Sequence, residues 1–379
     1  MEKFAQIKLG FLGGGANSLI GQMHRIAALM HERYQLVGGV FSSNFDCSLA
    51  HAMSLDIPQN RVYDTVDSLI SGEMRLSASE RMAVVAVLTP NALHFDAVKK
   101  LLSTGFHVIC EKPMTTTVED ALTLQSLVEQ TGKVFCVTHT YTGYPMVRQM
   151  RELIARGLIG DIQRIDAQYL QGWLNPIVKD DQKRANTWRL DPAVSGSSCC
   201  FGDIGIHAFN LVEFVSGLSA KSVLADLHSG ERSNHLDVDG TALLRIGTDV
   251  RGSIRASQIA TGEENNLSIS IYGNRGGLKW EQENPNRLVH LPEEEPSQIY
   301  TPGNMYLGAL AMSSTKLPAG HPEGLFDAMA NIYSGVASAI HGDATSPGSF
   351  PTIEDGVRGV RFVAASVASN LRGQQWVDL

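Results

Sequence analysis

The sequence has no surplus of basic residues and no long hydrophobic run. Lys and Arg total 31 against 39 Asp and Glu, so the formal net charge is −8. Proteins that bind nucleic acid usually carry a basic face, and no dense run of Lys or Arg occurs here. The longest apolar run, Met82 to Leu88, is far shorter than the roughly 20 residues of a membrane-spanning helix. We therefore expect neither nucleic acid nor a membrane as a partner.

Cysteines are few, and their spacing suits neither a disulfide framework nor a metal site. There are 5, an odd number, with no CxxC pair and no ligand-like spacing to the 12 histidines. Adjacent Cys199 and Cys200 are poorly placed to bridge each other and fit better as small packing residues. The N-terminal residues lack the apolar stretch and cleavage site of a signal peptide. We expect reduced thiols, no bound metal and a cytoplasmic location.

Glycine, in contrast, is present in excess. It accounts for 36 of the 379 residues, whereas about 7% is usual. Collagen is excluded, because no three-residue glycine period occurs and only 14 residues are proline. The glycines are therefore expected at tight turns, or where the backbone closely approaches another group.

The first third of the chain alternates short apolar runs with segments of helical periodicity. Buried strands are expected at residues 7–12, 36–41, 83–88, 106–110 and 134–138. Strands that alternate with helices of about 10 to 15 residues predict parallel βαβ units. A doubly wound α/β domain is thus expected over residues 1–138.

The pattern changes after Thr138. A helix near 145–157 and a strand at 162–169 are followed by strand-like segments joined by short Gly-, Asp- and Asn-containing turns, at 241–246, 250–261 and 267–272. Such a succession indicates an antiparallel sheet. Residues 292–321, rich in Pro and Glu, are expected to be irregular, and two helices near 323–341 and 352–371 follow. Residues 139–379 are thus expected to form an α+β domain for substrate binding and oligomerisation.

Gly13, Gly15 and Gly21 lie between the first expected strand and the first expected helix. A dinucleotide pyrophosphate would meet backbone N–H groups and a helix N-terminus there. The usual third glycine would fall at Ser18, and the loop instead continues about three residues further to Gly21. A glycine turn without a ligand is the alternative, but the position at the start of a βαβ unit favours a cofactor. The expected contacts are Gly13, Gly15, Ala16, Asn17 and Ser18.

The end of the second expected strand bears on the choice of cofactor. An acid there would bind the ribose 2′-hydroxyl of NAD, but Ser42 and Ser43 occupy this position and Asn44 follows. No Arg or Lys follows directly to bind the 2′-phosphate of NADP. The cofactor is expected to be NAD or NADP, with NAD the favoured one.

Four further motifs follow the glycine loop in a fixed order. They are TPNALH (89–94), EKP (111–113), RELIARGLIGDI (151–162) and GDIGIHAF (202–209). Together the five resemble the Gfo/Idh/MocA oxidoreductases, named after glucose–fructose oxidoreductase, inositol dehydrogenase and a rhizopine-catabolism protein. The resemblance extends over essentially the whole chain. It implies a Rossmann domain followed by an α+β domain with an open-faced, mostly antiparallel sheet, and a homodimer or homotetramer assembled through that sheet.

The chain departs from the family pattern in three places. The glycine loop is longer, and the acid after the second strand is absent. Where many members carry a run of glycines before the GD motif, this chain has the segment GSSCC at 196–200. These differences bear on the cofactor preference and on the substrate, and they leave the reaction type unchanged.

The resemblance assigns the proton chemistry to Lys112, Asp203 and His207. Lys112 would hydrogen-bond the reacting oxygen and stabilise its developing negative charge. His207 would act as general base in oxidation and general acid in reduction, since histidine titrates near neutrality. Asp203, four residues before His207 and so on one face of a helix, would orient the hydroxyl and hold the Lys112 charge. Taken singly, these residues also fit a solvated loop lysine and a surface Asp–His pair.

The same resemblance extends the cofactor and substrate sites. Further cofactor contacts are expected at Thr89, Pro90, Asn91, His94, Glu111 and Lys112, with His94 positioning a loop or simply starting a helix. Aromatic faces and a guanidinium suit a polyhydroxylated ring, although core tryptophans with a structural Arg189–Asp191 pair are the alternative. The candidate substrate contacts are Tyr141, Trp173, Trp188, Arg189, Asp203, His207 and His321.

These expectations predict an NAD(P)-dependent dehydrogenase that interconverts an alcohol and a ketone on a sugar, sugar derivative or cyclitol. One alternative is a redox-assisted glycosidase that retains its cofactor. Another is a sugar-sensing regulator on the same fold that lacks catalysis. The presence of Lys112, Asp203 and His207 together argues against the regulator, because a binding module has no need of this set.

Overall fold

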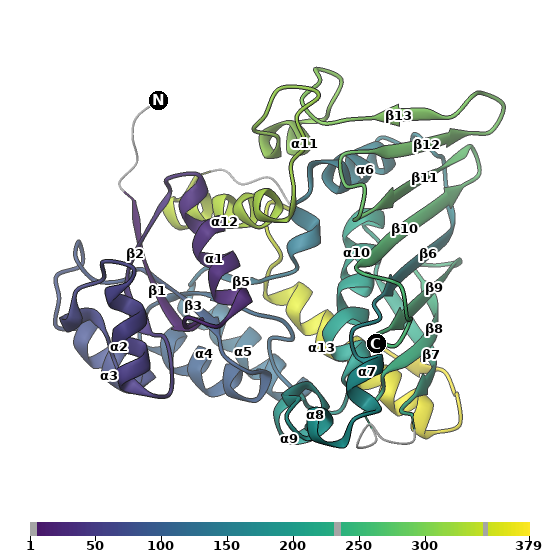
Figure 1. Ribbon diagram of the computed structural model, residues 1–379. Coiled ribbons are helices and arrows are strands. Elements are labelled where there is room, and N and C mark those ends of the chain that lie inside the picture. Colours follow the sequence, from purple (N-terminus) through teal and green to yellow (C-terminus); the bar gives the residue numbers. More distant parts are fainter. Residues whose placement is uncertain (1–5, 231–235, 344–347) are drawn as a thin grey trace. The chain divides into compact units, whose positions relative to one another are not determined.

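The computed structural model describes residues 6–230, 236–343 and 348–379 (Figure 1). The chain forms two compact units. The first unit lies within Met1–Thr115, Glu119–Thr140 and Met329–Gly356, and the second within Thr116–Val118, Tyr141–Ala328 and Val357–Leu379. A single division at residue 138 therefore does not describe these units, because the late segment Met329–Gly356 returns to the first.

The first unit is built on a five-stranded parallel sheet of order β2-β1-β3-β4-β5. Its strands are β1 (Ile7–Gly13), β2 (Tyr34–Val40), β3 (Val84–Leu88), β4 (His107–Cys110) and β5 (Phe135–Val137). The connecting helices include α1 (Leu19–Met30), α2 (Phe45–Met53), α3 (Val66–Glu73), α4 (His94–Ser103) and α5 (Val118–Thr131). Strand β3 is buried throughout, as expected of a parallel strand that is covered on both faces. The predicted Rossmann fold is confirmed.

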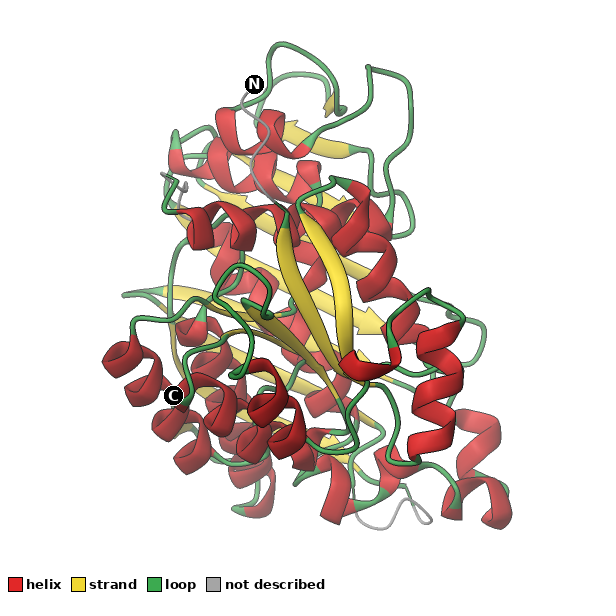
Figure 2. Ribbon diagram, turned by 90° about the vertical axis from the view of Figure 1, so that its left-hand side faces the viewer, coloured by secondary structure: helices red, strands yellow, loops and turns green. Residues whose placement is uncertain are grey.

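The strand order places β1 between β2 and β3. The chain winds in opposite directions from β1, so the carboxyl ends of β1 and β3 flank the topological switch point, where ligands bind in open α/β sheets. The glycine loop follows β1, and the TPNALH motif follows β3. In Figure 2, with helices in red and strands in yellow, helices flank the strands of this unit.

The late helix α12 (Leu325–His341) completes the core of the first unit. Its apolar side chains from Met329 onward, including Ile332, Tyr333 and Val336, are buried together with Leu9 and Tyr34 of the parallel sheet. Figure 1 shows α12 beside α1. The helical periodicity of this segment was predicted, but its packing partner depends on the tertiary fold.

The second unit contains a nine-stranded sheet of order β13-β12-β11-β10-β6-β9-β8-β7-β14. All neighbouring strands are antiparallel except β6 and β9, so the predicted mostly antiparallel sheet is confirmed. The strands are β6 (Ile162–Leu170), β7 (Ala220–His228), β8 (Asp239–Ile246), β9 (Val250–Ser257), β10 (Asn266–Gly273), β11 (Gly276–Glu281), β12 (Leu288–Pro292), β13 (Gln298–Tyr300) and β14 (Val377–Asp378).

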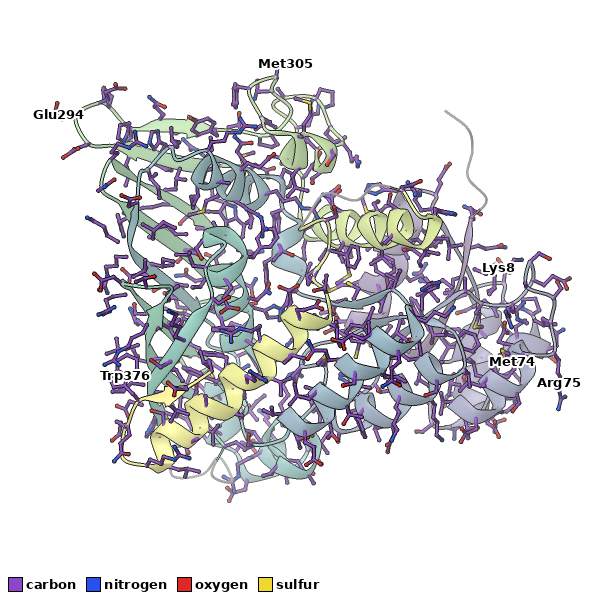
Figure 3. All side chains as sticks on the ribbon, turned by 180° about the vertical axis from the view of Figure 1, so that it is seen from behind. Lys8, Met74, Arg75, Glu294, Met305 and Trp376 are labelled. Carbon is purple, nitrogen blue, oxygen red and sulfur yellow. The ribbon has the colours of Figure 1, made fainter. Side chains whose placement is uncertain are left out.

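One face of this sheet packs against helices, and the other is open. The core contains side chains of α6 (Pro145–Ala155), α10 (Ile206–Ser216) and α13 (Ile353–Leu371) together with alternate residues of the strands. In β8, Leu244 is buried, whereas its neighbours Leu243 and Arg245 are exposed. Arg245 lies over the ring of Trp376, which Figure 3 labels, with 4.2 Å between the guanidinium carbon and the ring centroid. This alternation is typical of an antiparallel sheet with one face away from the core.

The segment 292–321 is more ordered than expected. It contains β13, which pairs with β12, and the short helix α11 (Ala309–Ser314). The carboxylate of Glu152 on α6 accepts hydrogen bonds from the N–H groups of Leu310 and Ala311 and so caps this helix. The expectation of an irregular segment was wrong here, because the cap comes from a distant part of the chain. Met305, labelled in Figure 3, is exposed on the loop between β13 and α11.

Three short helices lead toward the GDIGIHAF motif: α7 (Asn175–Val178), α8 (Asp181–Ala185) and α9 (Pro192–Ser195). Among the helices of the described residues, none is both long and apolar enough to cross a bilayer.

Candidate active site

The glycine loop adopts a backbone that other residues would strain. Gly13 and Gly14 have positive φ angles of 91° and 76°, a region that favours glycine. A Cβ atom at Gly15 would lie 2.7 Å from the carbonyl oxygen of Phe41. Helix α1 begins directly after Ser18, and its first turn contains no acidic residue. A glycine loop beside the positive end of a helix, with Ala16 and Asn17 exposed, fits a pyrophosphate.

Gly21 takes over the role of the third glycine of the loop. A Cβ atom there would lie 2.3 to 2.6 Å from backbone atoms of Gly14, so only glycine permits this approach of helix and loop. Ser18, at the usual glycine position, is instead the N-cap of α1, and its Oγ accepts a hydrogen bond of 3.0 Å from the Gly21 N–H. The longer loop therefore keeps the close packing that dinucleotide-binding loops need.

A cavity of about 670 Å³ adjoins the glycine loop at the end of β2. Its lining contains Ser42 and His51 but no carboxylate; the full lining is Gly15, Ala16, Asn17, Ser18, Phe41, Ser42, Cys47, Ala50, His51 and Ser54. Arg25 lines a neighbouring cavity that shares the loop. Burial, and then the charge of Arg25, lowers the pKa of His51. Ser43 is exposed and lies outside this lining.

His94 links the loops that follow β3 and β4. Thr89, Pro90 and Asn91 lead into α4, and His94 is its first residue and fully buried. Its Nε2 lies 2.7 Å from the Thr89 carbonyl oxygen, and its Nδ1 lies 2.8 Å from that of Pro113. Burial lowers the pKa of His94. The histidine thus holds the TPNALH loop to the EKP loop within the first unit.

Glu111 and Lys112 follow β4 directly, and the Lys112–Pro113 peptide bond is cis. The Glu111 carboxylate contacts His24 Nε2 at 2.9 Å, and accepts hydrogen bonds from Thr138 Oγ1 and from the Lys112 N–H. Burial opposes ionisation, but the hydrogen bond from His24 and the charge of Lys112 lower the pKa of Glu111 to about 2. The carboxylate is therefore ionised and already engaged by three groups, while Lys112 is half-buried.

Asp203 lies on a π-helical turn, Phe201–Gly205, that leads into α10. The four-residue spacing to His207 predicted an ordinary helix, and this expectation was wrong. The buried Asp237 anchors the start of the turn, because its carboxylate accepts hydrogen bonds from the N–H groups of Cys199 (3.0 Å) and Phe201 (2.7 Å). Such local widening of a helix is frequent at functional sites.

Two neighbours hold the carboxylate of Asp203. Its Oδ2 accepts a hydrogen bond of 2.8 Å from Gln258 Nε2 and lies 3.2 Å from Arg189 Nε. Gln258 is fully buried, and its Oε1 faces Cys199 Sγ at 3.4 Å, which fixes the orientation of the amide. Asp203 itself keeps a side-chain exposure of 20%. It is thus held in place while one part remains open to a ligand.

Arg189 lies against two exposed tryptophans. Its guanidinium carbon is 4.6 Å from the centroid of Trp188 and 5.8 Å from that of Trp173. Both rings are more than a third exposed. The alternative of core tryptophans with an Arg189–Asp191 pair was wrong, because Arg189 pairs with Asp203 and Asp191 caps α9 through the N–H of Ala193.

His207 is buried between aromatic rings. The ring of Tyr141 meets it edge-on with 5.0 Å between centroids, and that of Tyr169 lies at 6.2 Å. The hydroxyl groups of these two tyrosines are hydrogen-bonded to each other, and that of Tyr169 donates to Asn265 Oδ1 at 2.7 Å. Burial, and then Tyr141, raises the pKa of Tyr169, so the Tyr169 hydroxyl carries its proton at neutral pH. Tyr141 therefore belongs to the surroundings of His207.

His321 is exposed in the loop before α12, with its Nδ1 3.2 Å from the Pro318 carbonyl oxygen. Glu323, two residues further on, is buried, and its carboxylate accepts hydrogen bonds from the N–H groups of Lys316 and Leu317. Glu323 therefore has a structural part in this loop. Within the described ranges, no group of three or more His, Cys, Asp or Glu side chains is arranged to hold a metal ion.

Sequence reasoning did not identify Gln258, Tyr169, His24 or Tyr333. Gln258 follows β9, Tyr169 lies in β6, His24 lies on α1 and Tyr333 lies on α12. None of them belongs to a motif, and each comes to its partner only through the tertiary fold. A polar residue in an apolar stretch, such as His24 within LIGQMHRIAALM, was the only local signal.

Replacing Gln258 by Leu is expected to lower kcat/KM about 30-fold, because losing a hydrogen bond to a charged group costs about 2 kcal/mol. Steady-state kinetics would measure the effect. Gln168→Leu is the matched control, since that glutamine lies on β6 and donates to Asn266. Equal activity of both variants and the wild type would contradict a role of Gln258 at Asp203.

Comparisons with known proteins agree with this geometry. A family model described as an oxidoreductase family with an NAD-binding Rossmann fold matches residues 7–139, and a model of the GFO/IDH/MocA C-terminal domain matches residues 147–279. An inositol dehydrogenase homologue from Azotobacter vinelandii, solved with NAD+, is 32% identical with a TM-score of 0.94, and the match covers 100% of this chain and 98% of that one. The same homologue was solved with NADH and myo-inositol (31% identity, TM-score 0.91, covering 99% and 98%).

Two further relatives extend the comparison. An oxidoreductase from Sinorhizobium meliloti is 39% identical with a TM-score of 0.88, and the match covers 98% of this chain and 99% of that one. A levoglucosan dehydrogenase from Pseudarthrobacter phenanthrenivorans is 27% identical over 54% of this chain and 57% of its own length.

Proposed function

Since the chain belongs to the Gfo/Idh/MocA oxidoreductase family, with an NAD-binding Rossmann domain, we propose that it interconverts an alcohol and a ketone on a sugar, sugar derivative or cyclitol. The observation that carries this proposal is the group formed by Asp203, Arg189 and two tryptophans, on the same unit as His207. The inositol dehydrogenase homologue binds myo-inositol, and another relative is named for levoglucosan. Both compounds are polyhydroxylated rings.

The group of Asp203, Arg189, Trp173 and Trp188 suits a neutral sugar ring better than a phosphorylated one. The guanidinium of Arg189 faces the carboxylate of Asp203, so the two charges offset each other. The exposed faces of Trp173 and Trp188 offer apolar contact to the C–H face of a ring. Asp203 and Arg189 would accept from and donate to the ring hydroxyls. Tyr141 and His321 are the remaining residues that we propose as substrate contacts.

The proton chemistry is proposed for Lys112, Asp203 and His207. His207 would take the hydroxyl proton during oxidation and return it during reduction. Its ring packs against that of Tyr141 in a T-shaped contact, which limits the orientations that the imidazole can take. The Lys112 ammonium would donate a hydrogen bond to the reacting oxygen as negative charge develops there. When bound, the nicotinamide supplies the hydride chemistry.

The cofactor contacts are proposed at the glycine loop, at Thr89, Pro90 and Asn91 after β3, and at Ser42 and Ser43 after β2. Gly15 supports this proposal, because it lines the cavity beside the loop and presents backbone without a side chain there. Ser42 lines the cavity next to the loop. A hydroxyl at this point neither repels the 2′-phosphate of NADP nor binds both ribose hydroxyls of NAD as an acid does. NAD is the favoured cofactor, and NADP is expected to be accepted.

Replacing Ser42 by Asp is expected to raise the ratio of kcat/KM for NAD to that for NADP about tenfold, because a carboxylate repels the 2′-phosphate and accepts from the ribose hydroxyls. Initial rates with each cofactor at one fixed substrate concentration would measure it. Ser71→Asp is the control, since Ser71 is exposed on α3 and lies outside the cavity lining. A ratio that stays the same in Ser42→Asp would place the ribose elsewhere.

A homodimer or homotetramer through the open face of the nine-stranded sheet is also proposed. Leu243, with 45% exposure, lies on this face with Arg245 and Trp376. An open sheet face with a large exposed apolar side chain is suited to burial against a second copy. Light scattering of the purified protein would give the number of chains.

A panel of sugars and cyclitols with NAD and with NADP tests the proposed reaction through the absorbance of the reduced cofactor. The expected result is reduction of cofactor with at least one neutral polyol. Release of a chromogenic aglycone without net cofactor reduction would instead indicate the redox-assisted glycosidase. Tight cofactor binding without turnover of any compound would indicate the sugar-sensing regulator.

A further inference from the structure

A chain of buried polar side chains leads from α12 through α1 to the loop that carries Lys112. Tyr333 Oη lies 2.7 Å from His24 Nδ1, and His24 Nε2 lies 2.9 Å from Glu111 Oε1. Thr138 Oγ1 donates to the same carboxylate oxygen. His24 and Tyr333 are almost completely buried. All four residues belong to the first unit.

In the Tyr333–His24–Glu111 network, every hydrogen bond can be donated in the same direction, toward Glu111. Burial raises the pKa of Tyr333, so its hydroxyl keeps its proton and can donate it to His24 Nδ1. His24 then donates its Nε2–H to the Glu111 carboxylate, which accepts only. Each polar atom along the chain has a partner of the matching kind. A fully satisfied buried network of this sort fixes its members in one arrangement.

Tyr333 also contacts Tyr34, a residue of strand β2. Its ring meets that of Tyr34 edge-on with 5.3 Å between centroids, and the Tyr34 hydroxyl donates to the Tyr333 carbonyl oxygen at 2.8 Å. Tyr34 thus packs against the same helix but takes no part in the hydrogen-bond network that ends at Glu111. This difference makes Tyr34 a suitable control.

The other carboxylate oxygen of Glu111 reaches the neighbouring residue. Oε2 accepts the backbone N–H of Lys112 at 3.3 Å. The Lys112 charge also contributes to the low pKa of Glu111, after the larger effects of burial and His24. The carboxylate therefore connects the buried chain both to the backbone and to the charge of Lys112.

We propose that Tyr333, His24 and Glu111 act as one set of positioning residues for Lys112. The set holds the ionised Glu111 carboxylate at one point, and the carboxylate fixes the loop from which Lys112 reaches the reacting oxygen. The inference rests on the proposed role of Lys112. It gives the late segment Met329–Gly356 a part in catalysis, because α12 supplies Tyr333 to the Rossmann unit.

Three variants and one control test this set: Tyr333→Phe, Glu111→Gln, the double variant and Tyr34→Phe. Tyr333→Phe is expected to lower kcat about fivefold and Glu111→Gln about 30-fold, with the affinity for NADH changed less than about threefold. The double variant should match Glu111→Gln, because residues that act through one another do not add. Tyr34→Phe should keep the wild-type kcat, although it removes a hydrogen bond to the same helix.

A second measurement needs no substrate. Hydrogen exchange of the Lys112 amide, followed by mass spectrometry or NMR, reports the contact with Glu111 Oε2. The rate is expected to rise about tenfold in Tyr333→Phe and in Glu111→Gln, and to stay unchanged in Tyr34→Phe.

The two measurements separate this inference from the proposed function. An unchanged Lys112 exchange rate, or kcat losses that multiply in the double variant, would overturn the inference. A loss of NADH affinity with unchanged kcat would also overturn it, and would leave Glu111 only its predicted part as a cofactor contact. If no polyol is a substrate, the proposed function is wrong. The exchange rates would still decide whether Tyr333, His24 and Glu111 position Lys112.

Discussion

Replacing Lys112 by Ala lowers kcat about a thousandfold in our expectation, the loss that follows removal of a group that stabilises developing charge in a transition state. Lys112 follows the carboxyl end of β4, where ligands bind in open α/β sheets. Its loop is fixed on both sides, by the Glu111 carboxylate before it and by His94 on the Pro113 carbonyl after it. Such fixation is characteristic of a residue that must reach one atom.

Binding of NADH should survive this substitution, because the glycine loop is untouched. Fluorescence titration with NADH and steady-state rates at saturating substrate separate the two effects. Lys100→Ala is the matched control: this lysine lies on α4 of the same unit and pairs with Asp67 in an exposed ion pair. Turnover of Lys112→Ala near that of Lys100→Ala would contradict the catalytic assignment.

The architecture could be predicted from local patterns where the pattern reports burial. The apolar run of β3 indicated a buried strand, and successive strand-like segments joined by short turns indicated an antiparallel sheet. Helix α12 shows the limit of such patterns. Its periodicity predicts a helix with one buried face, but the choice of sheet depends on contacts such as that between Tyr333 and Tyr34, far apart in the sequence.

The candidate site divides in the same way. The resemblance to the family predicted roles for Lys112, Asp203 and His207, because these residues lie in its motifs. The groups that hold them were missed, because Gln258 and His24 meet their partners only in the folded chain. The π-helical turn at Asp203 was missed for a related reason. It depends on the buried Asp237, which lies outside the motif.

The glycine excess has more than one physical origin. In the loop after β1, Gly13 and Gly14 have positive φ angles and Gly21 is pressed against the loop backbone. In the β10–β11 hairpin, Gly276 has a φ of 152° and serves a turn of the open sheet. The composition shows only that glycine is in excess. The backbone conformation shows which glycines serve the loop after β1 and which serve a hairpin.

Replacing Gly21 by Ala is therefore expected to weaken NADH binding about a hundredfold. The added Cβ would overlap the carbonyl oxygen, Cα and carbonyl carbon of Gly14, and all three are backbone atoms that no side-chain rotation can move. Overpacking of this kind costs about 1 to 3 kcal/mol. Here α1 and the glycine loop must separate, so the N–H groups that face a pyrophosphate move apart. Fluorescence titration with NADH would measure the loss.

Gly324→Ala is the control for this substitution, because no atom lies within 4 Å of a Cβ built there and its φ needs no glycine. Circular dichroism and the thermal unfolding midpoint would show whether Gly21→Ala remains folded. Because the strain is confined to the contact between α1 and the loop, we expect a folded protein with a lowered midpoint. Wild-type affinity for NADH in folded Gly21→Ala would mean that the cofactor does not bind at this loop.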